Sequence, residues 1–88
     1  MDKIFPHQFK AARVLACLGQ AEVCERAGIS LISLRRLESQ LHYADQVAAP
    51  TIEKVKSVLE AAGVIFFGPL EIAGVSGQYG VALRHPIA

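Results

Sequence analysis

The chain has 88 residues, enough for one small domain but too few for a second hydrophobic core or for a scaffold with a deep catalytic cleft. Hydrophobic residues make up 52% of it and charged residues 19%, so a core can form, although a domain of this size buries only about 60–65% of its unfolded surface and often gains stability by pairing. The formal net charge of +1 excludes a protein that binds nucleic acid through bulk positive charge alone. The positive charge is nevertheless concentrated, because residues 3–36 contain six basic and only two acidic side chains.

The composition also argues against several kinds of chemistry. Cys17 and Cys24 are too few for the disulfide framework of a small secreted protein, and no pair of histidines stands near them to suggest zinc. We therefore expect both cysteines to be buried in a reducing cytoplasm. No carboxylate pair, glycine-rich phosphate loop or signal peptide is evident, and no apolar run approaches the roughly 18 residues that span a membrane. The expectation is a cytoplasmic protein, not an enzyme, that needs no metal ion or cofactor.

Two helices are predicted at the start of the chain. Residues 7–18 carry apolar side chains at helical spacing, and Gly19 is expected to end this helix. Residues 20–27 form a second, shorter helix. It stops at Gly28, because glycine adopts the left-handed conformation of a helix end at little cost.

Two further helices follow. Ser30 is expected to cap a helix over residues 31–39, since its hydroxyl can accept a hydrogen bond from a free backbone N–H. Residues 40–49 show no clear period and are treated as a loop that can hold one helical turn. Residues 51–62 have the best amphipathic pattern in the chain, and Gly63 closes that helix.

The end of the chain has the composition of β-strands. Residues 64–67 are a β-rich run, residues 70–72 suggest a short strand, and residues 79–84 alternate apolar and other side chains. A hairpin this small is marginal in water by itself. We therefore expect it to pair with something else.

The second and third predicted helices have the spacing of a helix-turn-helix unit, which places its second helix in the DNA major groove. Small or apolar residues stand at the positions that such a unit buries or turns: Val23, Cys24, Ala27, Gly28, Ile29, Leu34 and Leu37. With these positions, the stretch from Gln20 to Glu38 (QAEVCERAGISLISLRRLE) resembles the phage-repressor-like, or XRE, family of helix-turn-helix transcriptional regulators. Residues 60–66 and 80–84 are similar to the tail of a bacterial subgroup, with the form Glu-Ala-Ala-Gly-Val-x-Phe, a glycine-rich gap and Gly-Val-x-Leu-Arg.

The resemblance implies a mainly α fold in two parts. Residues 1–62 would form a phage-repressor-like helix-turn-helix bundle of four to five helices, and residues 63–88 a short C-terminal β-hairpin that joins two subunits. It also implies a cytoplasmic regulator without metal or cofactor that binds a two-fold double-stranded DNA operator as a homodimer. The recognition helix would span about residues 30–39.

Individual residues carry expected roles from the family. Gln20 matches a glutamine that contacts a phosphate and braces the recognition helix, and Ser30 matches the residue that caps it. Arg36 matches a position that reaches base edges, where arginine can bridge guanine O6 and N7, the alternative being a solvated or phosphate-bound arginine. His42 and Tyr43 lie where a loop usually follows the DNA backbone, although exposed loop residues without a role fit equally well. The predicted DNA-binding set is Gln20, Ser30, Leu31, Ile32, Ser33, Arg35, Arg36, His42 and Tyr43.

Arg13 and Glu38 match a pair that forms a structural ion pair in many phage repressors, and we expect them to meet here. Leu31 and Ile32 depart from the family, which generally has polar or basic residues at these positions. Three interpretations stay open: contact with thymine methyl groups, an interface with a partner protein, or a rotated helix that places Leu31 in the core.

Two hypotheses of function follow. The first is a sequence-specific DNA-binding regulator whose hairpin joins two subunits through pairing of strand edges and burial of apolar side chains. Its predicted dimerisation residues are Val64, Phe66, Val81 and Leu83. The alternative is a protein-binding module, such as an antitoxin or anti-activator, that uses the same scaffold and the patch formed by Leu31 and Ile32.

Overall fold

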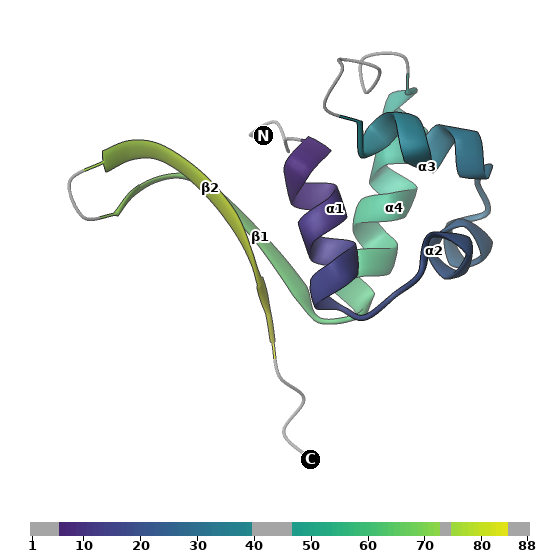
Figure 1. The fold of residues 1–88 in the computed structure, drawn as a ribbon, viewed down its shortest axis with the longest axis horizontal. Coiled ribbons are helices and arrows are strands. Elements are labelled where there is room, and N and C mark those ends of the chain that lie inside the picture. The colour runs from purple at the N-terminus through teal and green to yellow at the C-terminus, as the bar shows by residue number, and fades with distance from the viewer. Residues whose placement is uncertain (1–5, 40–46, 73–74, 85–88) are drawn as a thin grey trace.

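The computed structural model describes residues 6–39, 47–72 and 75–84. This part of the chain consists mainly of helices, followed by one antiparallel β-hairpin (Figure 1). The elements in chain order are α1 (Pro6–Leu15), α2 (Gln20–Ala27), α3 (Leu31–Leu37), α4 (Ala49–Ala61), β1 (Val64–Ile72) and β2 (Val75–Leu83).

Helix α1 ends earlier than its apolar pattern predicted. The chain leaves the helix at Cys17, which has a left-handed backbone with φ of 59°. The N–H groups of Cys17 and Leu18 donate back to the carbonyl oxygens of Val14 and Arg13, both at 3.0 Å, the paired bonds of a Schellman helix end. The prediction that Gly19 ends the helix is therefore wrong. The expectation that Cys17 is buried is also wrong, because this turn leaves the side chain exposed.

Helices α2 and α3 are joined by a turn of three residues. Gly28 adopts φ 67° and ψ 39° and ends α2, as its sequence position predicted. Ser30 then caps α3, with its hydroxyl accepting a hydrogen bond of 3.1 Å from the backbone N–H of Ser33. Helix α3 ends at Leu37, two residues earlier than expected.

Helix α4 starts two residues before the predicted boundary, at Ala49, with Pro50 in its first turn, where the missing N–H of proline costs nothing. After Ala61 the chain turns through Gly63, whose φ of 99° is accessible to glycine. The carbonyl oxygen of Gly63 accepts a hydrogen bond of 2.6 Å from the N–H of Arg84. The base of the hairpin is thus tied to the end of α4.

One apolar core is shared by all the helices and the start of the hairpin. Phe9 and Ala12 come from α1, and the rings of Phe9 and Phe66 lie 5.6 Å apart between centroids. The core therefore includes the first residues of β1 and does not stop at the helices. Its buried members are Phe9, Ala12, Val23, Cys24, Leu34, Leu37, Val55, Leu59 and Val64.

The two strands are longer than predicted and pair antiparallel, with register irregularities between Phe67 and Leu70 and between Leu70 and Ile72. Near the helices their side chains alternate between two faces. Val64 is only 3% exposed, whereas Ile65 is 42% exposed. Farther out, the hairpin curves away from the helices (Figure 1).

The inward face of the hairpin carries the residues predicted to join two subunits. Val64 belongs to the buried core, and Phe66, Val81 and Leu83 pack against that core within the same chain. The side-chain amide of Gln8 in α1 adds a polar anchor by donating to the carbonyl oxygens of Phe67 and Gly80, both at 3.1 Å. The sequence pattern had identified an apolar face but not its occupant, which is the helix bundle of the same chain. Among the described residues, no helix is both long and apolar enough to cross a membrane.

Candidate functional site

The outward face of α3 combines apolar and cationic side chains. Ile32 is 62% exposed and Leu31 is 37% exposed, so the interpretation that placed Leu31 in the core is wrong. Arg35 and Arg36 follow them by four residues each and are exposed as well. Residues four apart lie on the same side of a helix, with about 5–6 Å between their Cβ atoms. Each arginine therefore stands one turn beyond an exposed aliphatic side chain.

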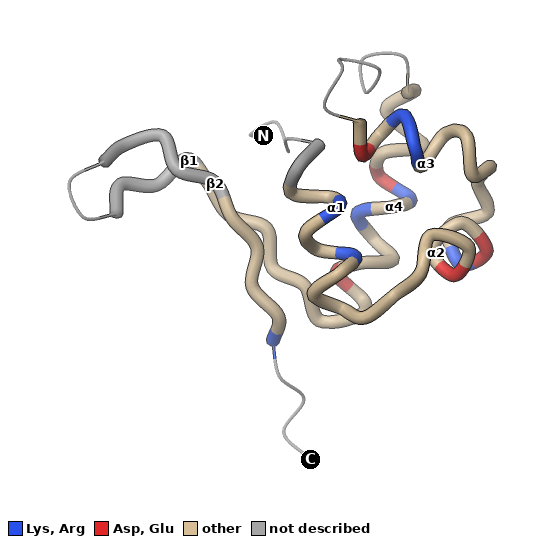
Figure 2. The backbone as a smooth tube through the Cα atoms, viewed as in Figure 1, with Lys and Arg blue, Asp and Glu red and all other residues tan. Residues whose placement is uncertain are grey.

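The charge of this face comes from Arg35 and Arg36. No ion pair involves Arg35 or Arg36 in the part of the chain that the structure describes, whereas Arg26 on α2 pairs with Glu22. Figure 2 shows basic positions on α3 and an acidic position at its end. That acidic residue, Glu38, turns inward and its side chain is only 5% exposed. The exposed face of α3 is thus apolar at its start and positively charged at its end.

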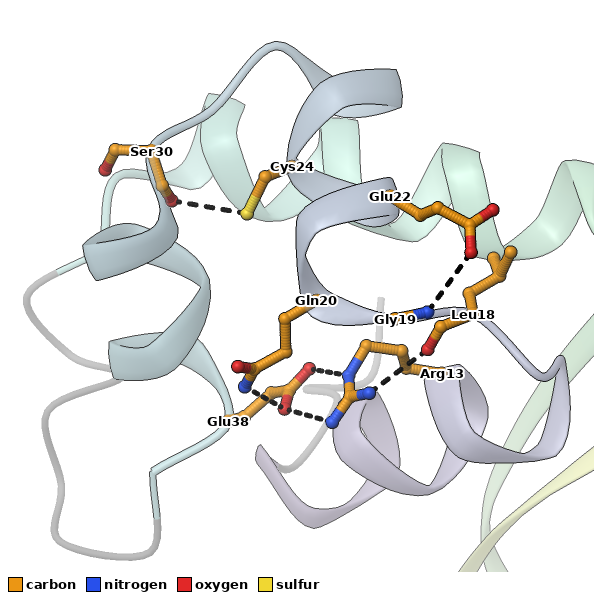
Figure 3. Close-up of polar contacts among 8 residues, drawn as sticks. All are labelled: Arg13, Leu18, Gly19, Gln20, Glu22, Cys24, Ser30 and Glu38. Carbon is orange, nitrogen blue, oxygen red and sulfur yellow. Dashed lines mark hydrogen bonds and ion pairs between the residues drawn. The ribbon is translucent and has the colours of Figure 1, made fainter.

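A buried ion pair fixes the end of α3 against α1. The Arg13 Nε donates to Glu38 Oε2 at 2.8 Å, and its Nη2 donates to Glu38 Oε1 at 3.1 Å (Figure 3). The third guanidinium nitrogen, Nη1, donates to the carbonyl oxygen of Leu18 at 3.1 Å. The expected pair is therefore present, and it also joins α3 to the turn that follows α1.

Gln20 extends this network to the start of α2. Its Nε2 donates to Glu38 Oε1 at 3.3 Å, so the bracing contact expected of Gln20 is made through the carboxylate of Glu38 (Figure 3). An amide NH₂ has two donor hydrogens, and this bond uses one of them. Helices α1, α2 and α3 are thus connected through a single carboxylate.

The start of α3 is held by hydroxyl groups and a thiol. The hydroxyls of Ser30 and Ser33 lie 2.9 Å apart, in addition to the capping bond described above. Cys24 Sγ donates to the carbonyl oxygen of Ser30 at 3.6 Å. Burial, reinforced by the negative charge of Glu38 and opposed by Arg35, raises the pKa of the Cys24 thiol, so it stays protonated and able to donate.

Structural contacts of two residues were not predicted, one beside α3 and one at the hairpin. The sequence indicated that Cys24 is small and buried, which is correct, but not that its sulfur holds the turn before α3. Gln8 showed no sequence signal at all, because a buried glutamine on an apolar helix face looks like a break in the pattern. His42 and Tyr43 lie outside the described residues. Within the described ranges, no three His, Cys, Asp or Glu side chains gather to hold a metal ion.

Comparisons with known proteins leave this geometry as the main guide to function. No protein-family model, no curated protein and no solved structure matches the chain.

Proposed function

We propose that this protein is a sequence-specific, double-stranded DNA-binding transcriptional regulator of the phage-repressor-like XRE class, with α3 as its recognition helix. The observation that carries the proposal is the exposed face of α3, where Arg35 and Arg36 have no carboxylate partner among the described residues. The helix itself is held by buried contacts at both ends. A helix that enters the major groove needs exposed side chains for base edges and a rigid attachment to its own domain.

The roles of the polar residues follow from this placement. Arg36 would donate to guanine O6 and N7, and Arg35 would contact base edges or phosphates. Ser30, Ser33 and the second amide hydrogen of Gln20 are suited to phosphate oxygens, which position a protein on DNA but carry no sequence information. Base recognition would thus come from α3, and positioning on the DNA from the start of α3 together with Gln20 on α2.

The test is a binding titration against the duplex upstream of the protein's own gene and a scrambled duplex, at low and near-physiological salt. We expect tighter binding to the native duplex that survives the higher salt, because specific contacts are lost less with salt than phosphate contacts. Arg36→Ala should weaken binding to the native duplex by about 1–3 kcal/mol and reduce the preference for it. Equal, salt-sensitive binding to both duplexes would overturn the proposal.

Arg84→Ala supplies the matched control. Arg84 has the same side chain and charge and is exposed, but it lies at the base of the hairpin beside Gly63. Its replacement should leave the preference between the two duplexes unchanged. An equal loss of preference in Arg84→Ala and Arg36→Ala would show that net charge, and not α3, determines binding.

The proposed regulator acts as a homodimer through its hairpin. The two-stranded sheet that the structure describes has backbone N–H and C=O groups along its outer edges that can pair with the strand of another chain. The outward-facing apolar residue Ile65, rather than the inward-facing Val64 and Phe66, is available to a second subunit. Two recognition helices would then face major-groove segments about 34 Å apart.

Sedimentation at micromolar concentration tests the dimer, and a monomeric wild-type chain would overturn it. Ile65→Glu should lower the association constant without unfolding the subunit, because Ile65 is 42% exposed. Deleting residues 64–88 is a poor test, because it removes Val64 from the core and uncovers Phe9.

A protein-binding module is the second candidate, because the 62% exposure of Ile32 and the adjoining Leu31 form an apolar patch suited to a partner protein. Failure to bind any duplex, together with capture of a partner that Ile32→Ala abolishes, would favour this role.

A further inference from the structure

The two exposed aliphatic residues of α3 have no role in the contacts assigned so far. Leu31 and Ile32 cannot donate or accept hydrogen bonds, yet they occupy the first turn of α3, and the N-terminal residues of a recognition helix are those that reach base edges. Burial in the protein's own core does not explain them, since Ile32 is 62% exposed.

The surroundings of this pair favour DNA as the occupant. Arg35 and Arg36 lie one turn farther along the same face, and Glu38, at the end of α3, is buried against Arg13. An apolar partner protein would have to desolvate two guanidinium groups that have no carboxylate partner among the described residues, which is costly. A polyanion with apolar groups on its surface satisfies both halves of the face.

The major groove offers such a group at one type of position. Among the four bases, only thymine presents an apolar group there, the methyl on C5, while the other base edges present hydrogen-bond donors and acceptors. A 5-methylcytosine carries its methyl on the same ring atom. A branched aliphatic side chain at the start of α3 therefore fits a C5 methyl group, whichever of the two pyrimidines bears it.

We infer that Ile32, supported by Leu31, is a specificity-determining contact for the C5 methyl group of a pyrimidine, so that the protein recognises thymine, or methylated cytosine in its place, close to the guanine assigned to Arg36. This inference rests on the proposed function and goes beyond it by naming the chemical group that is read. Unmethylated cytosine and uracil would be discriminated against at that position.

The expected size of the effect is modest and measurable. Burial of one CH₂ or CH₃ group contributes about 0.8 kcal/mol, which corresponds to about fourfold in Kd. For an operator with two such contacts, one in each half-site bound by a dimer, loss of both methyl groups would raise Kd by about fifteenfold. These values are well within the resolution of a fluorescence-anisotropy titration.

The experiment removes the methyl group from the DNA and the side chain from the protein. A duplex is first selected from a random-sequence pool with the wild-type protein and is then synthesised in two forms, one with thymine and one with uracil. The quantity measured is the ratio of Kd for the uracil form to Kd for the thymine form. We expect a ratio of about four or more for the wild type and close to one for Ile32→Ala.

Val14→Ala is the control variant. Val14 is 59% exposed, nearly as much as Ile32, but lies on α1, so its replacement should leave the wild-type ratio unchanged. Because the readout is a ratio for one protein on two duplexes, any effect of a variant on folding or on dimerisation cancels. A second comparison replaces the critical T·A pair by C·G, and methylation of that cytosine at C5 should recover part of the lost affinity.

The outcomes separate this inference from the proposed function. If the protein enriches a duplex but its uracil-to-thymine ratio is close to one, or the same ratio persists in Ile32→Ala, the methyl contact is wrong while DNA binding stands. If no duplex is enriched from the pool, the proposed function fails and the inference fails with it. Capture of a partner protein that Ile32→Ala abolishes would then assign the patch to the protein-binding role instead.

Discussion

The guanidinium of Arg13 and the carboxylate of Glu38 form two parallel hydrogen bonds, of 2.8 and 3.1 Å, between α1 and the residue that caps the C-terminus of α3. Their side chains are 13% and 5% exposed, so the pair is largely removed from water. Loss of one partner leaves an uncompensated buried charge, which costs more than the intact pair contributes. Arg13→Ala and Glu38→Ala are therefore each expected to destabilise the protein by about 2–4 kcal/mol in urea unfolding.

The double variant measures the interaction between Arg13 and Glu38 apart from the contacts that each makes with other residues. Arg13→Ala/Glu38→Ala should be less destabilised than the sum of the single variants by at least about 1 kcal/mol, because it leaves no orphaned charge. The exposed pair Arg26–Glu22, with a distance of 3.4 Å, provides the control, and its coupling should be below about 0.5 kcal/mol. Additive effects at Arg13 and Glu38 would contradict a structural role for the pair.

The hairpin contains a close contact between a glycine and an aromatic ring. A Cβ placed on Gly80 would lie 2.7 Å from Cζ and 2.8 Å from Cε2 of Phe67, the residue opposite it in the register. Gly80→Ala should therefore displace the ring and destabilise the protein by about 1–3 kcal/mol, as other overpacked sites do.

The same contact gives a rescue experiment. In a Gly80→Ala background, Phe67→Leu removes the atoms that would clash, so it should cost less than Phe67→Leu costs in the wild type. Thermal melts of the four proteins measure this difference. Equal costs of Phe67→Leu in both backgrounds would show that the ring does not rest on Gly80.

Two helix ends adopt the left-handed conformation with different residues. Gly28 ends α2 at φ 67°, and a Cβ added there would meet no atom within 4 Å, so Gly28→Ala should cost about 1 kcal/mol for backbone reasons alone.

Cys17 ends α1 at φ 59°, where glycine is the favoured residue. Cys17→Gly is therefore expected to stabilise the protein by about 0.5–1 kcal/mol in urea unfolding. Destabilisation by Cys17→Gly would indicate that the side chain makes a contact worth more than the strain.

Local signals accounted for both ends of α2 and for the start of α3. Gly28 and Ser30 define the turn between α2 and α3 through their own backbone and side-chain preferences, so a short stretch of sequence was sufficient. The end of α1 was placed wrongly because the left-handed residue is Cys17, and no local rule selects cysteine over the nearby Gly19.

Contacts between distant parts of the chain were harder to predict. An alternating strand pattern shows that one face of the hairpin is apolar but not whether it covers its own domain or a second subunit. Whether Val64 and Phe66 face their own domain or a second subunit depends on how the chain turns at Gly63. The Gln8 contacts with the hairpin, 59 and 72 residues away, could not be found from spacing at all. The ion pair between Arg13 and Glu38 was anticipated because the resemblance to a family supplied the partner.

The raised pKa of Cys24 predicts a loss of stability at alkaline pH. Burial, together with Glu38, moves the pKa of the thiol above its ordinary value of 9.0, so the folded state holds the proton more tightly than the unfolded state does. The contribution of the Cys24 thiol to stability is complete below the ordinary pKa and decreases as pH rises from there through the pKa of the folded state.

Cys24 is best compared with Cys24→Ala in a Cys17→Ser background, which removes the exposed thiol. There, the stability advantage of Cys24 over Cys24→Ala in urea unfolding should be constant from about pH 6 to about pH 8 and should narrow above about pH 9. An advantage that is independent of pH up to about 10 would show that the thiol titrates in the folded protein as it does in the unfolded chain.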